Sequence, residues 1–451
     1  MTAPARVVAY HALCAIDEGS QDLSTAISQG RARLRDPRDR ALASDIVHGT
    51  LRWRRTLDYL LARGTRDGHP PADERLLTIL RLSLYQILYL DRVPASAVVD
   101  DAVELARLAQ RAHATGFVNA LLRGLLRQRH KLGVPQRPVS ANREQELAYL
   151  GIAHSHPDWL LERWLDRFGF DAAESWARFD NTPPPLTVRA NALAAPREAL
   201  REWFDARGVV TTPTLYAPDG LVIQEAPEGG LPEDDERRWV IQDESSQLVA
   251  QMVDARSGQR VLDLCAAPGG KTTAMAGDMR DEGLIVACDV RPRRLRILRA
   301  ALAHAGTQRS HVVHVDRDGP LPFREPFDRI LVDAPCSGLA TIRRDPDIKW
   351  RRREEDLAGH ATIQRQLLSR AAPLVAVGGR LIYATCSSEP DENDDVVAAF
   401  LDAHPEFERD AWLEGLPASI RPLVDETGAL RPLPHVHGLE AFYAARLVRR
   451  A

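Results

Sequence analysis

The chain has 451 residues, of which 44% are hydrophobic and 27% are charged, and its formal net charge is −4. This composition is typical of a soluble protein of two to four domains, and no apolar run is long enough to span a membrane. The first residues lack the pattern of a cleavable signal peptide. Five cysteines without paired metal-ligand spacing argue against a disulfide framework and a metal site, so we expect reduced thiols and a cytoplasmic location.

The charge is unevenly distributed. Residues 1–140 carry 21 Lys and Arg against 14 Asp and Glu, a net charge of +7, so the remaining residues carry −11. A basic front part indicates a nucleic-acid-binding module, although a solvated arginine-rich face explains it equally well. Only Lys131, Lys271 and Lys349 are lysines, and two of them lie in motifs described below. Those two positions favour a compact point charge over a planar guanidinium.

Apolar residues recur at three- and four-residue spacing from Ala5 to about Arg129. Residues 74–90 are apolar on most sides, which predicts a central buried helix, and Asp73 and Asp100 are candidate helix N-caps. We therefore expect residues 1–140 to form a compact all-α bundle.

Residues 131–150 mix Pro, Gly and polar residues and are typical of a linker that enters a new helix. Residues 150–235 then predict a small α+β subdomain. Helices are expected at 156–169 and 197–208, and strands within 182–191 and at 221–224. No chemistry is assigned to this subdomain.

Residues 236–451 alternate predicted strands with helices, which is typical of a mostly parallel, doubly wound α/β domain. Strands are expected near 260–265, 284–290, 311–316, 327–333, 379–385 and 441–448. Three of them end in Asp289, Asp316 and Asp333, and ligands of such folds lie at the carboxyl ends of strands. Asp316 could accept a hydrogen bond from an adenine amino group, or could simply form a turn before Arg317.

The stretch RVLDLCAAPGGKTT at 260–273 predicts a strand, a glycine turn and the start of a helix. A phosphate-binding P-loop needs a glycine where Cys265 stands, so that interpretation fails by one residue. An adenosyl ligand fits better, because Asp289 is placed for ribose hydroxyls and Lys271 could face a carboxylate or a nucleic-acid backbone. S-adenosylmethionine carries such a carboxylate. The alternative is that Asp263 and Asp289 only cap helices.

Two cysteines follow predicted strands on the ligand side, Cys336 in DAPCSG and Cys386 in YATCSS. One could be a small buried hydrophobe, but two at equivalent positions indicate thiol chemistry. Carbon 5 of a pyrimidine becomes nucleophilic only after a thiolate adds at carbon 6. A methyl donor, a thiol and an acid such as Asp333 together describe cytosine-C5 methylation. Either cysteine could be the nucleophile on this reasoning alone.

The strings DLCAAPGGKTT, VDAPCSG, RRDPDIKW and YATCSS resemble the motifs of the Nop/Sun family of RNA cytosine-C5 methyltransferases. The front part is similar to NusB-type RNA-binding domains through ARVVAYHALCAID, DRALASDIVHGTLRW, LRLSLYQILYL and GFVNALLRGLLR, as in the bacterial Sun/RsmB branch. This resemblance implies a NusB-like domain at 1–140, the subdomain at 150–235 and a Rossmann-like methyltransferase domain at 236–451. It also implies methylation of 16S ribosomal RNA with S-adenosylmethionine.

The resemblance carries residue roles as well. It implies that Cys386 is the nucleophile and that Cys336 assists product release, and the chemical reasoning above adds Asp333 as the third catalytic residue. The implied cofactor-binding residues are Cys265, Ala266, Ala267, Pro268, Gly269, Gly270, Lys271, Asp289, Asp316 and Asp333. Ala340 stands where members commonly have Gly, which puts the local loop conformation in question.

Two further hypotheses remain open at this point. One is a tRNA-directed enzyme of the same family, which differs only in its substrate. The other is a catalytically inactive RNA-binding or antitermination factor, against which the intact Asp333, Cys336 and Cys386 argue. For the leading hypothesis we expect a monomer that acts on unassembled or partly assembled small-subunit RNA.

Overall fold

The computed structural model describes residues 3–139, 142–411 and 417–450, so positions 140 and 141 of the predicted linker lie outside it. By their contacts, residues form two compact units, 1–182 with 342–354 and 183–341 with 355–451. Among the described residues, no helix has the length and apolarity needed to cross a membrane.

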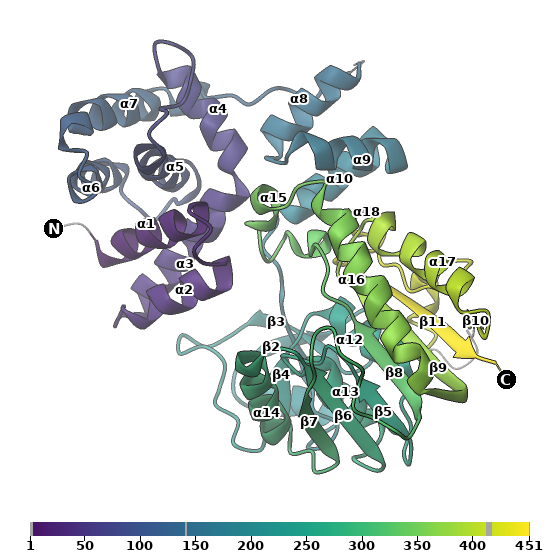
Figure 1. The fold of residues 1–451 in the computed structure, drawn as a ribbon. Helices are drawn as coiled ribbons and strands as arrows, with labels where there is room; N and C mark the ends of the chain where they lie inside the picture. Colours follow the sequence, from purple (N-terminus) through teal and green to yellow (C-terminus); the bar gives the residue numbers. More distant parts are fainter. Residues whose placement is uncertain (1–2, 140–141, 412–416, 451) are drawn as a thin grey trace. The chain divides into compact units, whose positions relative to one another are not determined.

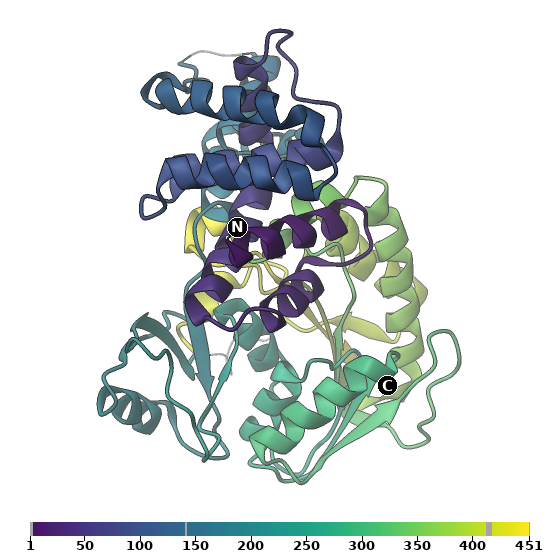
Figure 2. The same cartoon turned by 90° about the vertical axis from the view of Figure 1, so that its left-hand side faces the viewer.

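The first unit is all-helical (Figures 1 and 2), and the all-α bundle predicted for residues 1–140 forms its larger part. Its helices are α1 Pro4–Asp17, α2 Leu23–Ala32, α3 Pro37–Arg52, α4 Arg54–Gly64, α5 Glu74–Tyr89, α6 Ala95–Leu108, α7 Thr115–Arg127, α8 Arg143–Ala153, α9 Asp158–Phe168, α10 Phe170–Asp180 and α15 Ile348–Arg351. The predicted helix at 156–169 corresponds to α9.

Helix α5 lies at the centre of the bundle and contacts α1, α3, α4, α6 and α7 (Figure 1). Eleven of its sixteen residues are buried, which confirms the prediction from its all-round apolarity. Asp73 caps it by accepting hydrogen bonds from the backbone N–H groups of Arg75 and Leu76. The predicted cap at Asp100 is wrong, because α6 starts five residues earlier, directly after Pro94, and Asp100 lies inside the helix.

Residues 342–354 carry the RRDPDIKW motif and belong to the first unit, although the chain on both sides belongs to the second. Trp350 Nε1 donates to Leu51 O at 2.6 Å. The Lys349 ammonium is buried and donates to Arg52 O, Ser155 O and Asn181 Oδ1 at 2.9–3.0 Å. Burial lowers the pKa of Lys349 to about 7. Three acceptors thus match the three donors of one ammonium group.

The second unit begins with a four-stranded antiparallel sheet in the order β2-β3-β1-β4. Its elements are β1 Leu186–Ala190, α11 Arg197–Asp205, β2 Val210–Pro213, β3 Gly220–Glu225 and β4 Trp239–Ile241. The predicted strands and helix correspond to β1, β3 and α11. Strands β2 and β4 were not predicted, because three or four residues are too few to show an alternating pattern.

The rest of the second unit is a doubly wound α/β domain with strand order β10-β11-β9-β8-β5-β6-β7, which confirms the predicted fold class (Figure 1). Strands β5 to β9 are parallel, and β10 and β11 are antiparallel. The strands are β5 Arg260–Asp263, β6 Leu284–Asp289, β7 Ser310–His314, β8 Phe327–Asp333, β9 Val375–Thr385, β10 Phe407–Arg409 and β11 Tyr443–Arg449. The helices are α12 Glu244–Val253, α13 Gly270–Asp278, α14 Pro292–Ala305, α16 Asp356–Ala371, α17 Asp394–Ala403 and α18 Pro434–His437.

Alternate residues of each central strand bury opposite faces of this sheet. On β9, Leu381 and Tyr383 pack in the core that includes α16 and α17. Ile382 and Ala384 pack in the core that includes α12 and α13. Because both faces are covered, the strands are apolar throughout and their polar groups lie at the strand ends.

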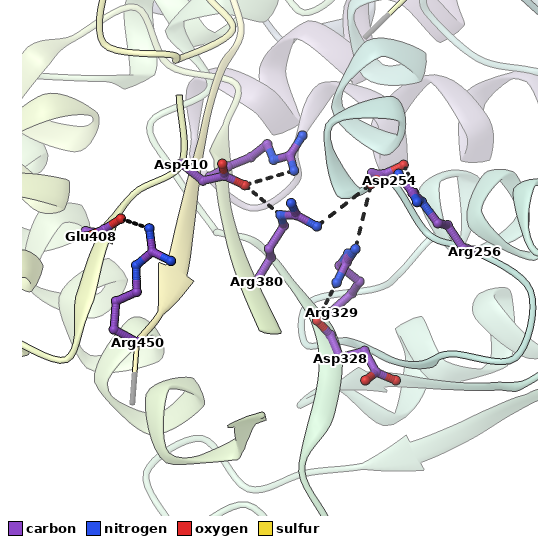
Figure 3. A network of polar contacts seen from close by, with 9 residues as sticks. Asp254, Arg256, Asp328, Arg329, Arg380, Glu408, Asp410 and Arg450 are labelled. Carbon is purple, nitrogen blue, oxygen red and sulfur yellow. Dashed lines mark hydrogen bonds and ion pairs between the residues drawn. The ribbon is translucent and has the colours of Figure 1, made fainter. Parts of the chain in front are cut away.

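A charge network lies toward the amino-terminal side of β8 and β9 (Figure 3). Arg380 Nε and Arg446 Nη2 contact Asp410 Oδ2 at 2.6 and 3.0 Å. Arg329 and Arg380 lie 3.7 and 3.9 Å from Asp254 Oδ2. Arg329 and Arg446 are buried and the other three side chains are half-buried, and burial lowers the pKa of Arg446 to about 10. The network therefore ties β8, β9 and β11 together on the side opposite the acids at the carboxyl ends of the strands.

Candidate active site

The glycine turn after β5 has the predicted form. The Ala267–Pro268 peptide bond is cis, Gly269 has a φ of +113°, and α13 begins at Gly270. A Cβ atom on Gly269 would lie 3.0 Å from Leu298 Cδ1 and 3.1 Å from Ala301 Cβ on α14. The turn therefore needs glycine both for its backbone conformation and for its close approach to the next helix.

A cavity of about 480 Å³ opens beside this turn, at the carboxyl ends of the parallel strands. Its walls include Cys265, Ala267, Lys271, Asp289 and Asp333, together with Cys336 and Cys386. Its size is in the range of ordinary small-molecule sites, and the strand ends are where ligands of this fold bind. Ala266, Pro268, Gly269 and Gly270 lie in the same turn but do not line the cavity wall.

Lys271 and Asp333 form an ion pair on the cavity wall, with Nζ 2.6 Å from Oδ2. Burial disfavours the ammonium form, but the charge and hydrogen bond of Asp333 outweigh it and raise the pKa of Lys271. The lysine is therefore a fixed cation between β5 and β8. Its partner was not predicted, because only the strand order brings the two residues together.

Asp289 has two roles in the structure. One carboxylate oxygen accepts from the backbone N–H of Arg291 at 2.9 Å, which holds the start of α14. The other lies 3.5 Å from Arg294, and the residue lines the cavity. The helix-capping alternative and the ligand-facing prediction are thus compatible for this residue.

Asp263 behaves differently from Asp289. It is buried, does not line the cavity, and accepts from Thr272 Oγ1 of α13 at 2.7 Å. Burial raises its pKa to about 7. Asp263 therefore anchors the helix after the glycine turn, which is the structural alternative considered above.

Asp316 is exposed and lies two residues after β7, before a bend at 317–319. Its neighbours Val315 and Arg317 line the cavity, whereas Asp316 itself does not. An adenine contact by Asp316 stays a prediction, and the turn-forming alternative describes its present position.

The two predicted cysteines come together at the end of the cavity. Cys336 Sγ lies 3.1 Å from Cys386 Sγ. The hydrogen bond with Cys386 and then burial raise the pKa of the Cys336 thiol well above its usual range. Burial also raises the pKa of the Cys265 thiol and takes that of Cys288 to about 12, so these two thiols stay protonated as well.

Ala340 does not disturb this arrangement. It lies in the short 3₁₀ helix Leu339–Thr341, and its backbone N–H donates to Cys386 O at 3.1 Å. Its φ is not positive, so the backbone there does not require glycine.

Sequence reasoning missed Glu392, which is fully buried beside the two cysteine loops. Its carboxylate accepts hydrogen bonds from Ser337 and Ser387, the residues that follow Cys336 and Cys386. A charged residue 6 positions beyond Cys386 carries no spacing signal of its own, and only its burial in the structure marks it. Among the described residues, no group of three or more His, Cys, Asp and Glu could hold a metal ion.

Comparison with known proteins decides the family. Residues 250–448 match the model of 16S rRNA methyltransferase RsmB/F, residues 3–127 match the NusB family, and residues 156–228 match a ferredoxin-like domain of RsmF/B-like methyltransferases. The probable ribosomal RNA small subunit methyltransferase B of Bacillus subtilis is 37% identical over 91% of each chain. The chain belongs to the RsmB/F family.

Two further similarities cover essentially the whole chain. The ribosomal RNA small subunit methyltransferase B of Pseudomonas putida is 33% identical over 99% of this chain and 98% of its own length. The crystal structure of PH0851 superposes with a TM-score of 0.78 and 26% identity, over 100% of this chain and 99% of that one. The resemblance to this family's motifs is thereby confirmed, and the chain is an enzyme, a methyltransferase that uses S-adenosylmethionine.

The cavity residues fit this cofactor by their chemistry. Asp289 offers a carboxylate for ribose hydroxyls, and Val290 and Val315 offer apolar surface for an adenine ring. One N–H group of the Lys271 ammonium donates to Asp333, which leaves two for the amino-acid carboxylate of the cofactor. Arg294 on the cavity wall offers that carboxylate a second cation.

Proposed function

We propose that this enzyme methylates carbon 5 of a cytosine in 16S ribosomal RNA through a covalent bond between Cys386 and carbon 6. The observation that carries the proposal is the placement of two thiols 3.1 Å apart on the wall of the cofactor cavity, beside the Lys271–Asp333 pair. A nitrogen or oxygen atom of a substrate can attack the methyl group directly, so an enzyme that methylates such an atom needs no thiol. Carbon 5 of a pyrimidine is not nucleophilic by itself, so a C5 methyltransferase needs a nucleophile to activate the ring.

Cys386 is the proposed nucleophile. The raised pKa of the Cys336 thiol keeps that thiol protonated, so it is the weaker candidate for attack and can donate its S–H to the Cys386 sulfur. Cys386 releases its own proton to solvent as it attacks, and the buried ammonium of Lys271 on the wall of the same cavity stabilises the negative charge on the attacking sulfur. S-adenosylmethionine, when bound, supplies the electrophilic methyl group.

Asp333 is the proposed acid. Addition of sulfur at carbon 6 places negative charge on the ring, and a proton delivered to ring nitrogen 3 neutralises it. Asp333 lines the cavity and can relay that proton: it takes the proton from the Lys271 ammonium along the 2.6 Å hydrogen bond, and nitrogen 3 returns it by the same route at elimination. Carbon 5 then carries the electron pair that forms the new carbon–carbon bond.

Cys336 is the proposed assistant in release. After methyl transfer, the proton on carbon 5 must leave before the Cys386–carbon 6 bond can break. Cys336 lies next to Cys386, and once its thiol has released its own proton to solvent, the resulting thiolate can accept the proton from carbon 5. Elimination then returns the electron pair of the carbon–sulfur bond to Cys386.

The cofactor assignment includes the turn from Cys265 to Lys271, with Asp289, Asp316 and Asp333. Ala266, Pro268, Gly269 and Gly270 would act through backbone position, and the others through side chains. We assign three domains, 1–140, 150–235 and 236–451, with the basic first domain contacting RNA. The enzyme would act as a monomer in the cytoplasm on unassembled or partly assembled small-subunit RNA. Positions 140, 141 and 412–416 lie outside the described residues.

The test is a denaturing gel of protein incubated with 16S RNA and S-adenosylmethionine. Cys336→Ala should accumulate a slowly migrating protein–RNA adduct, because addition proceeds and elimination stalls. Cys386→Ala and the Cys336→Ala/Cys386→Ala double variant should show none. Asp333→Ala should also show none, because the unprotonated ring is a poor acceptor.

Two outcomes would change the proposal. An adduct with Cys386→Ala and none with Cys336→Ala would exchange the roles of the two thiols. If no variant forms an adduct and the wild-type enzyme yields no 5-methylcytosine in 16S RNA, the mechanism is wrong. Methylated tRNA in place of 16S RNA would instead move the substrate to the tRNA alternative.

A further inference from the structure

The two reactive cysteines belong to different loops. Cys336 follows β8, and Cys386 follows its parallel neighbour β9. The strand ladder ends at Asp333 and Ala384, so it fixes the starts of the two loops but not the positions of the two sulfur atoms. The backbone N–H of Ala340 joins the two loops by donating to Cys386 O at 3.1 Å, and a side-chain contact directly beside both cysteines further restrains the 3.1 Å separation of the sulfurs.

The Glu392 carboxylate supplies that contact. Its Oε1 accepts from the Ser337 backbone N–H at 2.8 Å and from Gln364 Nε2 of α16 at 3.0 Å. Its Oε2 accepts from the hydroxyls of both Ser337 and Ser387 at 2.5 Å. One carboxylate therefore binds the residue next to Cys336 and the residue next to Cys386 at the same time.

The segment that carries Glu392 is itself fixed to β9. The Tyr383 hydroxyl donates to Glu392 O at 2.5 Å. Asn393 accepts from Thr385 Oγ1 at 2.6 Å and donates to Ser387 O at 3.0 Å. All of these groups are buried, so none exchanges its partner for water. Glu392 is thus held from the strand on one side and holds both loops on the other.

The carboxylate is unusual in what it lacks. Within the described part of the chain, no basic side chain lies within ion-pair distance of Glu392. A buried carboxylate without a cation is stable only when several donors satisfy it, and the four donors named above do so. Its negative charge is also one of the causes that raise the pKa of the Cys336 thiol.

We propose that Glu392 is a positioning residue that bridges the loops of Cys336 and Cys386 and so sets the distance between the two thiols. It touches neither sulfur and neither lines the cavity nor contacts a substrate in the proposed reaction. This inference rests on the proposed function for its catalytic consequence, but the geometric claim concerns the thiols alone.

The direct test is binding of phenylarsine oxide to the full-length enzyme without RNA or cofactor. The arsenic exchanges its oxygen, as water, for two thiol sulfurs, so tight binding needs two neighbouring thiols. Wild-type enzyme should bind one equivalent, and Cys336→Ala in the same chain shows how much of this signal comes from the pair. Glu392→Ala should weaken binding at least about tenfold and lower kcat about 100-fold with KM nearly unchanged, as expected for a misplacement of about 1 Å.

Glu392→Gln is the conservative variant. Its amide oxygen can accept from Ser337 N–H and Gln364, and its NH₂ group can donate to the two serine hydroxyls. The bridge is then retained without its charge, and both arsenical binding and kcat should recover to within about tenfold of wild type. Asp410→Asn, a half-buried carboxylate of the arginine network, is the matched control, and it should lower stability without altering arsenical binding.

The outcomes separate this inference from the proposed function. Wild-type arsenical affinity in Glu392→Ala would overturn it, as would equal losses in Glu392→Ala and Glu392→Gln. If Glu392→Ala does not fold, Ser337→Ala and Ser387→Ala each remove one serine hydroxyl from the bridge. Each should weaken arsenical binding severalfold, and unchanged binding in both would again overturn it. If Glu392→Ala loses arsenical binding but Cys386→Ala methylates RNA normally, the bridge stands and the proposed function fails.

Discussion

At the carboxyl ends of β6 and β8, Asp289 and Asp333 line a cavity, and each accepts only one or two protein hydrogen bonds or ion pairs. Toward the amino-terminal side of β8 and β9, Asp254 and Asp410 are instead enclosed by arginines from several strands (Figure 3). Both regions belong to one sheet and hold buried or half-buried charges. They differ in how much hydrogen-bonding capacity each carboxylate retains.

This difference separates a site from a structural joint. At the arginine end, Asp410 pairs with two guanidinium groups, and the charge serves only to join strands. At the cavity end, Lys271 is the one cation paired with Asp333 by the described contacts, and its remaining donors face the cavity. In this protein, a buried charge therefore indicates a functional site only where its protein partners leave some of its hydrogen-bonding positions unused beside a cavity.

Lys271→Met has the largest expected effect and tests whether the Lys271–Asp333 pair takes part in catalysis. The variant keeps the length of the side chain but removes the ammonium that orients Asp333 and favours the Cys386 thiolate. We expect kcat to fall about 10²- to 10⁴-fold, as for loss of acid–base support, with a folded enzyme. Single-turnover methylation measures it, and circular dichroism is the control. Activity within threefold of wild type would show that this pair is only structural.

Asp410→Asn tests the arginine end. It leaves Arg380 and Arg446 without a carboxylate in a mostly buried setting, so we expect the free energy of unfolding to fall by about 3 kcal/mol. Methylation by the folded protein should stay unchanged. The matched control is Arg450→Ala, which breaks the exposed Arg450–Glu408 pair and should leave the free energy of unfolding nearly unchanged. Equal effects of the two variants would remove the distinction between buried and exposed pairs.

Asp263→Asn tests the one strand-end acid that serves structure. Its pKa is about 7 in the fold and about 3.9 when unfolded, so its contribution to stability is complete below pH 4 and is lost as pH rises to 7. An asparagine side chain does not ionise, so the variant does not lose this stability as the pH rises. Relative to wild type, it should gain about 3 kcal/mol in unfolding free energy between pH 4 and pH 7. Urea unfolding at both pH values measures the change, and a constant difference would contradict the raised pKa.

Asp289→Ala has the smallest expected effect and tests whether this carboxylate binds the cofactor. Loss of a charge-assisted hydrogen bond to a ribose corresponds to about 1.5–3 kcal/mol, or about tenfold or more in cofactor affinity. Calorimetry with S-adenosylmethionine measures it. Unchanged affinity in Asp289→Ala would take this residue out of the cofactor site.

The strands and their acids could be predicted because they depend on local pattern. A buried parallel strand is a short apolar run, and its carboxyl end is where the chain meets solvent, so β5, β6, β8 and β9 are visible in the sequence. The glycine turn and the two cysteines follow those strands directly. The same reasoning placed a cap at Asp100, because a candidate capping residue inside a helix cannot be told from one at its start when the apolar pattern continues on both sides.

Local sequence patterns were enough to predict the helical front part, the parallel sheet, the glycine turn at 268–270 and the two thiols at strand ends. Which of these groups contact one another could be seen only in the tertiary fold. Lys271 pairs with Asp333, Glu392 bridges the loops of Cys336 and Cys386, and Lys349 is buried among three acceptors from separate helical segments. The physical reason is that periodicity records what one residue does relative to its neighbours in the chain, whereas these contacts depend on strand order and helix packing, which join residues far apart in sequence.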